Sequence, residues 1–353
     1  MAQNKIRVGL IGAGGNTRSR HIPGLKTQAG VELAAVANRS VASGRKIARE
    51  FGIEKVCTDW HEILDDSSID AVCIGTWPYM HSIMTTTALE FDKHVLCEAR
   101  MAANALEARE MLHASQSKPS LVTQIVPPPH LMHCEAHLID MISEGYLGDI
   151  INVHIRVSDG NAYPDSSTEV HWRQIREFSG NNVMFLGIWY ENLMRLIGPA
   201  NSVMAQSQVV VKQRPNWDGE KYFVSIPDQI DVIYSLAGGG NVNLSMSSVS
   251  GPFSEPMDLW IYGSKGTIRI RSKGPNELPV VEGASKGEKS MSAIKIPEEK
   301  QGKWRVEEEF INAIRGKEQI TRSNFVDSLK YMEFTDAVQE SCQTGSRIYL
   351  PLV

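Results

Sequence analysis

The residues with the clearest chemical potential lie near the start of the chain, in the stretch Gly12-Ala-Gly-Gly-Asn-Thr17. A strand-like apolar run leads straight into these glycines, which is typical of the first turn of a dinucleotide-binding βαβ unit. Gly12 would allow a tight turn, and Gly14 would let the backbone approach a pyrophosphate. The helix expected near Gly15 would direct its free N–H groups at the phosphates. Thr17 replaces the third glycine of the pattern, and its hydroxyl could reach a phosphate. The alternative is an ordinary glycine turn in an α/β domain.

A second polar stretch, Asn38-Arg39-Ser40, follows the strand expected over 31–37. In a doubly wound domain this position reads the adenosine ribose, and an acidic residue there would repel a 2′-phosphate. A neutral amide, a guanidinium and a hydroxyl suit a 2′-phosphate instead, so the sequence slightly favours NADP over NAD. The alternative is that Arg39 lies on a solvated loop or stacks on the adenine of NAD.

The elements that must position these residues alternate as strand and helix up to residue 125. This alternation predicts a parallel sheet and a Rossmann domain over 1–125, with the boundary near the Pro127–Pro129 run. The expected strands are 6–11, 31–37, 56–58, 71–75, 94–97 and 121–126, and the expected helices are 43–51, 60–64, 84–91 and 106–117.

The remaining chain, 126–353, has a different pattern. Strand-like runs separated by Gly, Pro and Asn predict a mostly antiparallel sheet, so this part is expected to be an α+β domain. The expected strands are 150–158, 202–211, 229–236, 241–248, 257–262 and 267–271, and the expected helices are 132–144, 183–197, 306–315 and 324–344. The polar, Gly- and Lys-rich stretch 274–303 is expected to be a loop.

Bulk composition limits the class of protein. A length of 353 residues predicts about two domains, and 42% hydrophobic with 22% charged residues is ordinary for a globular protein. A net charge of −5 without a basic run argues against nucleic-acid binding, and no apolar run is long enough to cross a bilayer. The first strand leaves no room for a signal peptide, and the five cysteines are scattered. We therefore expect a cytoplasmic protein with free thiols.

With these elements placed, the chain resembles the glucose–fructose oxidoreductase / inositol dehydrogenase (Gfo/Idh/MocA) family of NAD(P)-dependent sugar oxidoreductases. The resemblance runs nearly end to end. It implies a Rossmann domain plus a domain with an open-faced sheet, with substrate between that sheet and the nicotinamide, and dimers or tetramers formed through the sheet. The motifs that carry it are the glycine turn with His21-Ile-Pro23, Thr76-x-Pro78-x-x-His81, Lys93-His-Val-Leu-Cys-Glu98, Gly145-x-x-Gly148, Trp172-Arg173, Gly180 before the long helix, and Gly263-x-x-Gly266-Thr267.

The resemblance, together with positions at strand ends, assigns cofactor contacts along the chain. The Trp172-Arg173 segment resembles one that lies near the nicotinamide in relatives. The expected cofactor-binding residues are Gly12, Gly14, Gly15, Asn16, Thr17, Asn38, Arg39, Ser40, Thr76, Trp77, His81, Glu98, Ala99, Gln124, Trp172 and Arg173.

The catalytic positions depart from the family pattern. Where the family usually has Glu-Lys-Pro, with a lysine that contacts the reacting hydroxyl, this chain has Glu98-Ala99-Arg100. Where the family usually has Asp-x-Gly-x-His-x-x-Asp, this chain has Phe185-x-Gly-x-Trp189-x-x-Asn192, whose spacing places these three residues on one helical face. The family's acid–base mechanism therefore cannot be transferred to this chain.

Other side chains must then accept or donate the proton of the reacting hydroxyl. Tyr190 or His171 is the expected acid–base group, with Tyr190 favoured because it lies on the long helix. The alternatives are a core tyrosine, since residue 190 lies about 100° around the helix from its neighbour, and a loop histidine. Glu98 and Arg100 complete the candidate catalytic set, although a guanidinium is too basic to act as a base. Further candidates are Glu191, which the alternative makes a surface charge, Tyr163 and Asp165.

His130, His133 and His137 stand at spacings that would align three imidazoles on a continuous helix. Such an arrangement could bind a metal, but histidines on a half-buried helix are common. We therefore expect packing and surface histidines, and no metal.

The sequence predicts an NAD(P)-dependent oxidoreductase that moves hydride between the nicotinamide and a carbohydrate, polyol or glycoside. Aromatic residues suited to sugar faces or aryl groups support this: Trp77, Tyr79, Trp172, Trp189 and Tyr190. Two alternatives remain open. One is an enzyme that cleaves glycosides or epimerises its substrate while keeping its nicotinamide cofactor bound. It would form a transient ketone on the substrate, which acidifies a neighbouring C–H. The other is a non-catalytic nucleotide-binding protein.

Overall fold

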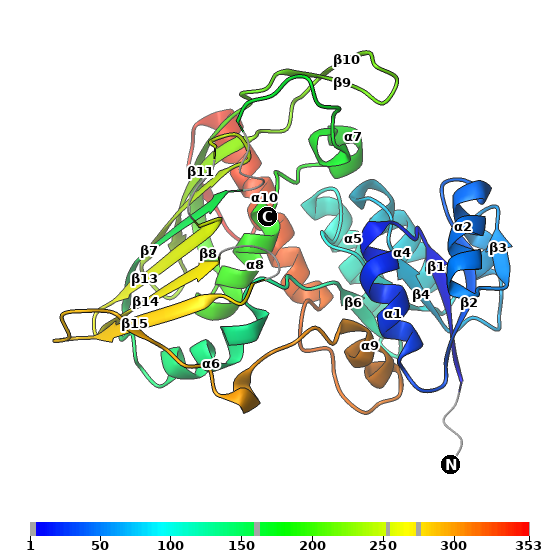
Figure 1. The fold of residues 1–353 in the computed structure, drawn as a ribbon, viewed down its shortest axis with the longest axis horizontal. Helices are drawn as coiled ribbons and strands as arrows, with labels where there is room; N and C mark the ends of the chain where they lie inside the picture. The colour runs from blue at the N-terminus through cyan, green and yellow to red at the C-terminus, as the bar shows by residue number, and fades with distance from the viewer. Residues whose placement is uncertain (1–4, 159–162, 252–254, 273–276, 353) are drawn as a thin grey trace. The chain divides into compact units, whose positions relative to one another are not determined.

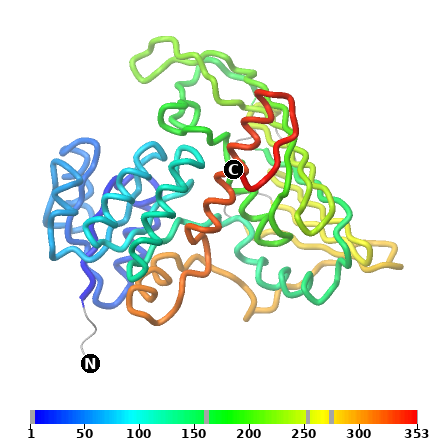
Figure 2. The backbone as a smooth tube through the Cα atoms, turned by 180° about the vertical axis from the view of Figure 1, so that it is seen from behind, coloured from blue at the N-terminus to red at the C-terminus, as the bar shows by residue number. Residues whose placement is uncertain are grey.

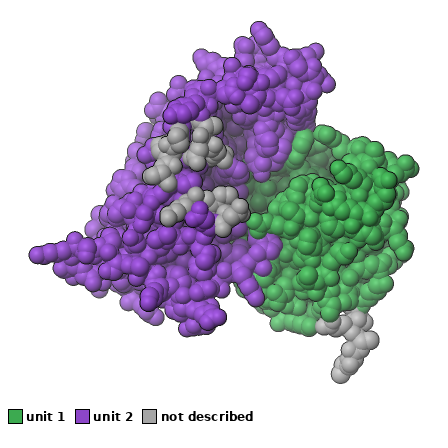
Figure 3. All heavy atoms as spheres, viewed as in Figure 1, with its two compact units in different colours: residues 1–127, 305–332 green, residues 128–304, 333–353 purple. Residues whose placement is uncertain are grey.

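The computed structural model describes residues 5–158, 163–251, 255–272 and 277–352 (Figure 1). The chain forms two compact units, which Figure 3 shows in different colours. Unit 1 comprises residues 1–127 and 305–332, and unit 2 comprises 128–304 and 333–353. In the part of the chain that is described, no helix is both long enough and apolar enough to cross a membrane.

Unit 1 is built on a six-stranded parallel sheet in the order β3-β2-β1-β4-β5-β6, the doubly wound order of dinucleotide-binding domains. Strands β4 and β5 are buried almost throughout, which explains their continuous apolar sequences. The strands are β1 Ile6–Ile11, β2 Val31–Ala37, β3 Lys55–Cys57, β4 Ala71–Ile74, β5 His94–Cys97 and β6 Thr123–Ile125.

The helices of unit 1 follow these strands in alternation, as expected. In Figure 1, α4 lies beside α5, and α1 lies beside α9. The helical segments are η1 Thr17–His21, α1 Ile22–Lys26, α2 Val41–Phe51, α3 His61–Leu64, η2 Pro78–Met80, α4 His81–Glu90, α5 Ala105–Ser117, α9 Val306–Ile314 and the first part of α10 Phe325–Thr344. Residues 305–332 thus pack with the N-terminal domain, whereas the sequence pattern assigned them to the second.

Unit 2 contains a nine-stranded sheet in the order β16-β15-β14-β13-β7-β12-β11-β8-β17. All neighbouring strands are antiparallel except β7 and β12, so the sheet is mostly antiparallel, as expected. Its strands are β7 Ile150–Ser158, β8 Ala200–Gln208, β11 Gln229–Leu236, β12 Asn241–Ser247, β13 Met257–Gly263, β14 Gly266–Ser272, β15 Val280–Ser285, β16 Ser292–Ala293 and β17 Ile348–Tyr349.

The two faces of this sheet differ. Along β11, buried Ile230, Val232 and Tyr234 alternate with exposed Asp231 and Ile233. Helix α8 and the C-terminal part of α10 cover the buried face through aromatic contacts with β11. The helices and the small hairpin that complete unit 2 are α6 Met132–Ser143, η3 Trp172–Gln174, α7 Arg176–Ser179, α8 Leu186–Ile197, η4 Glu298–Lys300, β9 Gln213–Pro215 and β10 Lys221–Phe223. Figure 2 follows the same chain from behind.

The stretch 274–303 differs from the expected loop. Its described part contains β15 and β16, which extend the sheet beyond β14 by antiparallel pairing, and η4. Residues 274–276 lie outside the described residues. β15 pairs with β14 on one side and with β16 on the other, so this stretch forms the outer part of the sheet at one edge.

Candidate functional site

The glycine turn of unit 1 is held at the point where the strand order reverses, between β1 and β4. Gly12 has φ of +83°, and a Cβ there would lie 2.6 Å from Thr76 Cγ2 and 2.9 Å from the Gly75 carbonyl carbon. The backbone N–H of Ala13 donates to Asn38 Oδ1 at 2.7 Å. The turn is therefore braced from the carboxyl ends of β2 and β4, where open α/β sheets bind ligands.

The structure explains why threonine is accepted at the third glycine position. Thr17 is buried, and its hydroxyl donates to the Gly12 carbonyl oxygen at 3.2 Å. A Cβ on Gly75 would lie 2.0 Å from Thr17 Oγ1, so this glycine supplies the space that Thr17 occupies. The expectation that the Thr17 hydroxyl reaches a phosphate is therefore corrected: the hydroxyl faces the turn itself.

A pocket of about 460 Å³ opens beside the turn. A Cβ on Gly14 would meet only the Gly75 carbonyl oxygen, at 3.7 Å, and a Cβ on Gly15 would meet nothing within 4 Å. The protein itself does not need glycine at these two positions, so the open backbone fits a dinucleotide pyrophosphate. The lining residues are Ile11, Gly12, Ala13, Gly14, Ala37, Asn38, Arg39, Ser43, Thr58, Asp59, Trp60, Gly75, Thr76, Trp77, Tyr79, Met80 and Met84.

Of the three residues after β2, Asn38 and Arg39 line the pocket. Asn38 uses its carboxamide oxygen to hold the glycine turn. Ser40 caps α2, because its hydroxyl oxygen accepts from the Ser43 N–H at 3.3 Å. The Arg39 guanidinium lies over the Trp77 ring, 5.5 Å from its centroid.

Several pocket residues were missed from the sequence, namely Ser43, Thr58, Asp59, Trp60, Met80 and Met84. Thr58 and Asp59 follow directly after β3, so the rule that ligands bind at carboxyl strand ends could have identified them. Trp77, expected both as a cofactor contact and as an aromatic for a sugar face, lines this pocket, and so does Tyr79, which was expected only at a sugar face.

Two of the expected cofactor contacts are internal braces. The His81 ring is fully buried, with Nδ1 2.8 Å from the Arg100 carbonyl oxygen and Nε2 3.1 Å from that of Thr76. Burial lowers the pKa of His81 and favours its neutral form. Gln124, also fully buried, donates through Nε2 to Glu309 Oε2 at 2.6 Å. Neither side chain lines the pocket.

A buried acidic network lies at the end of β5. His21 Nε2 is 2.8 Å from Glu98 Oε1, and His21 Nδ1 is 2.5 Å from Glu307 Oε1. Burial alone would lower the pKa of His21, but the hydrogen bonds with Glu307 and Glu98 raise it to about 9. Burial would raise the pKa of Glu98, yet the bonds from His21 and Asn16 lower it. Glu98 is thus held as a carboxylate.

The neighbours of Glu98 complete this end of the strand. Asn16 Nδ2 donates to Glu98 Oε1, and the Ala99 N–H donates to Glu98 Oε2 at 3.1 Å. The Arg100 side chain is buried. The three expected site residues 98–100 therefore form a fixed corner in which Glu98 and Ala99 are partly exposed, Glu98 at 14% of its side chain.

In unit 2, the Trp172–Arg173 segment forms an aromatic and cationic cluster. The Arg173 guanidinium lies 4.2 Å from the Trp172 ring centroid and 5.2 Å from that of Phe185, which immediately precedes α8. A guanidinium sandwiched in this way fixes both rings. This places Phe185, at the start of α8, next to the Trp172–Arg173 segment.

His171 begins the same segment and caps η3. Its Nδ1 accepts from the Arg173 N–H at 3.3 Å, while Gln174 Oε1 accepts from the His171 N–H at 3.0 Å. Burial and the charge of Arg173 lower the pKa of His171, so the neutral form dominates at pH 7. Because Nδ1 accepts, the ring proton lies on Nε2. His171 therefore presents an N–H donor.

Tyr190 faces the core, which corrects the expectation that it faces the substrate. It is 1% exposed and stacks on Phe334 with a centroid distance of 3.7 Å. Its hydroxyl oxygen accepts from the Ala200 N–H at 3.0 Å, and burial raises the pKa of Tyr190 to about 12. The 100° step from Trp189 directs the phenol between α10 and β11.

The remaining candidates are dispersed. His130 precedes α6 and packs on Trp189 with a centroid distance of 4.5 Å, so the three histidines do not share one helix. Within the described ranges, no group of three or more His, Cys, Asp or Glu side chains is arranged to hold a metal. Glu191 is buried, contrary to a surface role, and Tyr163 is 71% exposed. Asp165 accepts from Ser167 in a local turn.

Comparison with known proteins places these features in a family. The model for the NAD-binding Rossmann fold of the oxidoreductase family GFO_IDH_MocA matches residues 6–125, and the model for its C-terminal alpha/beta domain matches 139–351.

Individual relatives agree with this match. The chain is 24% identical over 265 residues to levoglucosan dehydrogenase of Pseudarthrobacter phenanthrenivorans, covering 70% of this chain and 67% of the relative. It is 25% identical over 283 residues to trans-1,2-dihydrobenzene-1,2-diol dehydrogenase of Bos taurus, covering 80% and 77%. A solved structure of levoglucosan dehydrogenase with NADH and levoglucosan superposes with a TM-score of 0.86 at 21% identity, covering 99% of this chain and all of the other. The glycine turn, the pocket beside it and the two matching family models together show that the chain is a member of the Gfo/Idh/MocA family of NAD-dependent oxidoreductases.

Proposed function

We propose that this oxidoreductase transfers hydride between a nicotinamide cofactor and the hydroxyl or ketone carbon of a carbohydrate, polyol or glycoside. The observation that carries this is the dinucleotide pocket at the reversal of strand order, in a chain of this family. Relatives named for levoglucosan and for a dihydrodiol support cyclic polyhydroxy substrates. When bound, the cofactor supplies the hydride acceptor or donor. Gly12, Gly14 and Gly15 would hold its pyrophosphate.

The proton chemistry departs from the usual family pattern, since Ala99 and Trp189 stand where lysine and histidine are common. In place of these groups, we assign His171 to the substrate oxygen. Its Nε2–H would donate a hydrogen bond and stabilise the negative charge that develops there when a ketone is reduced, and water at this exposed residue would supply the proton that completes the hydroxyl. Trp172 and Arg173 fix the segment that holds this histidine.

Arg39 supports a preference for NADP over NAD. It is the cation of the pocket-lining set after β2, and it is preorganised over Trp77. Asp59 also lines the pocket and acts in the opposite direction, because its charge would repel a 2′-phosphate. The proposed preference is therefore small.

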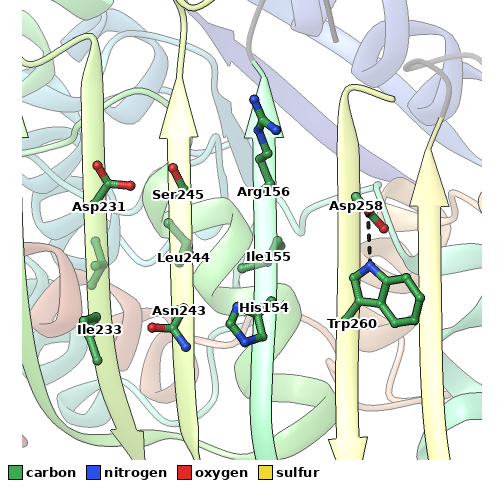
Figure 4. A pocket seen from close by; sticks show the side chains of 11 residues that line it. His154, Ile155, Arg156, Asp231, Ile233, Asn243, Leu244, Ser245, Asp258 and Trp260 are labelled. Atoms are coloured by element: carbon green, nitrogen blue, oxygen red, sulfur yellow. Dashed lines mark hydrogen bonds between the residues drawn. The ribbon is translucent and has the colours of Figure 1, made fainter. Parts of the chain in front are cut away.

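The exposed face of the unit 2 sheet supports assembly with further copies of the chain. A shallow pocket of about 440 Å³ crosses β11, β12, β7 and β13 (Figure 4). Asp231, Ser245, Arg156 and Asp258 are paired in register across these strands and form one mixed-charge row. The row lies on the exposed face of the sheet, and a C2 dimer would place the same face of two copies against each other. We propose a homodimer or homotetramer formed through this face.

The five cysteines are free, which supports a reducing compartment such as the cytoplasm.

The activity is tested by incubating the purified protein with NAD⁺ or NADP⁺ and a panel of sugars, polyols and glycosides, and following absorbance of the reduced nicotinamide. Cofactor-dependent oxidation of at least one cyclic polyol is expected. Binding of both nucleotides without turnover on any substrate, in either direction, would instead indicate a non-catalytic binding protein. Turnover without added nucleotide would indicate a retained-cofactor mechanism.

A further inference from the structure

We propose that Glu98, His21 and Glu307 form a buried charge triad that makes unit 1 bind the oxidised nicotinamide cofactor more tightly than the reduced one. This inference rests on the proposed function, because it concerns the cofactor of the same site. His21 is a positioning residue in this scheme, and Glu98 is the member that Asn16 of the glycine turn contacts.

The triad is built so that it keeps its charge. A neutral imidazole has a single N–H, yet both His21 nitrogens lie within hydrogen-bond distance of a carboxylate oxygen. Only the imidazolium donates to both carboxylates. Two carboxylates and one imidazolium leave one net negative charge. This charge is shielded from solvent, because the side chains that carry it are 14% exposed in Glu98, 0% in His21 and 3% in Glu307.

This negative charge lies in the half of the sheet where the nicotinamide nucleotide of the cofactor would bind. A doubly wound sheet consists of two mononucleotide-binding halves, and Glu98 follows β5 in the half formed by β4, β5 and β6. Asn16, from the turn that would hold the pyrophosphate, donates to the same Glu98 oxygen. The carboxylate is thereby fixed at the edge where the second nucleotide would lie.

The charge distinguishes the two redox forms of the cofactor. The oxidised nicotinamide ring carries a positive charge, and the reduced ring carries none. A fixed anion in a poorly screened site stabilises the cationic ring and leaves the neutral ring almost unaffected. Because His21 and Glu307 stand behind Glu98, the anion does not depend on a mobile surface side chain.

The test is the ratio of dissociation constants for the oxidised and reduced cofactor, measured by calorimetry on wild type, Glu98→Gln, Glu98→Asp and Glu307→Gln. Glu98→Gln removes the charge but keeps an oxygen acceptor for His21, and Glu98→Asp keeps the charge. Glu307→Gln leaves Glu98 in place and reduces the net charge of the triad to zero. Glu90→Gln, an exposed change of the same charge on α4, is the matched control.

We expect Glu98→Gln to weaken binding of the oxidised form about tenfold, or about 1.4 kcal/mol, with little change for the reduced form. Glu307→Gln shifts the ratio in the same direction, whereas Glu98→Asp and Glu90→Gln preserve it. Retained binding of the reduced cofactor shows that each variant is folded. An unchanged ratio, or an equal loss for both forms, in the two glutamine variants overturns the proposal. If wild type binds neither form, the proposed function itself fails.

Discussion

At the scale of a single residue, the tautomer of His171 decides which ring nitrogen can donate a hydrogen bond and which can accept one. Its Nδ1 is occupied by a backbone N–H, so a proton acceptor is not available on that side, and Nε2 offers a donor. Tyr190 illustrates the opposite case, since its hydroxyl is enclosed by the core and its pKa is raised to about 12. Chemical type alone would rank the two the other way.

We predict that His171→Ala lowers kcat about 10²-fold on whichever substrate is found, because one hydrogen bond to the developing oxyanion is lost. His171→Gln should recover much of this loss, since its side-chain amide can place an N–H near the Nε2 position. The measurement is kcat for both variants over a range of pH. Equal losses in the two variants, with a limb of the pH profile removed, would point to a general base instead.

Arg39 is predicted to discriminate between the two nucleotides. Arg39→Ala should weaken NADP binding by about 1.5–3 kcal/mol, as for a hydrogen bond to a charged group, and leave NAD little changed. Calorimetric titration of both nucleotides measures this, with Arg45→Ala on the exposed side of α2 as control. Equal weakening of both nucleotides would contradict a role at the 2′-phosphate.

His21 makes the stability of unit 1 depend on pH. Its pKa is raised from 6.5 to about 9 on folding, so its stabilisation is complete below pH 6.5 and is lost as pH rises through 9. The charged groups that face it are Glu98 and Glu307. The nearby Cys73 thiol has its pKa raised by burial and stays neutral in this window. The expected loss is on the order of 3 kcal/mol.

Urea unfolding of wild type and His21→Gln at pH 6, 7.5 and 9 measures this loss. The wild-type free energy of unfolding should fall more steeply between pH 6.5 and 9 than that of the variant. Parallel pH dependences in the two proteins would show that His21 is not the titrating group.

At the scale of elements, the glycine turn works because β1, β2 and β4 end together. Gly75 after β4 makes room for Thr17, and Asn38 after β2 holds the turn through Ala13. The two functions of glycine are separate here: Gly75 is needed for packing, whereas Gly14 leaves space that the protein does not use.

This separation predicts different outcomes for two alanine variants. Gly75→Ala should destabilise the protein by about 1–3 kcal/mol, because its Cβ would overlap Thr17 Oγ1 and the Gly12 carbonyl oxygen. Gly14→Ala should keep wild-type stability but weaken dinucleotide binding at least about tenfold, or about 1.4 kcal/mol. Thermal unfolding and calorimetric titration measure the two effects. The interpretation fails if Gly14→Ala binds NADH and NADPH as wild type does.

At the scale of the whole molecule, unit 2 presents a broad sheet face that its own helices do not cover. Exposed Ile233 and Met204 accompany the row that contains Arg156 on this face. We predict that Arg156→Glu lowers the oligomeric state, because it removes the cation from a row that otherwise contains two acidic residues. Sedimentation velocity compares it with wild type and with Lys46→Glu on the surface of α2. A monomeric wild type at micromolar concentration would contradict assembly through this face.

Sequence patterns among neighbouring residues determined much of the fold and the family of this protein. The alternation of apolar strands and helices predicted the parallel sheet, the glycine turn marked the ligand edge, and the motifs identified the family. These features depend on residues that are close in sequence, where periodicity and turn chemistry act directly. Only the tertiary structure decided features that depend on distant partners. Gly75 compensates for Thr17, residues 305–332 join unit 1, and Glu307 pairs with His21 across 286 positions of sequence. The orientation of Tyr190 was decided in the same way, because a helix periodicity gives the angle between neighbours but not which side the core occupies.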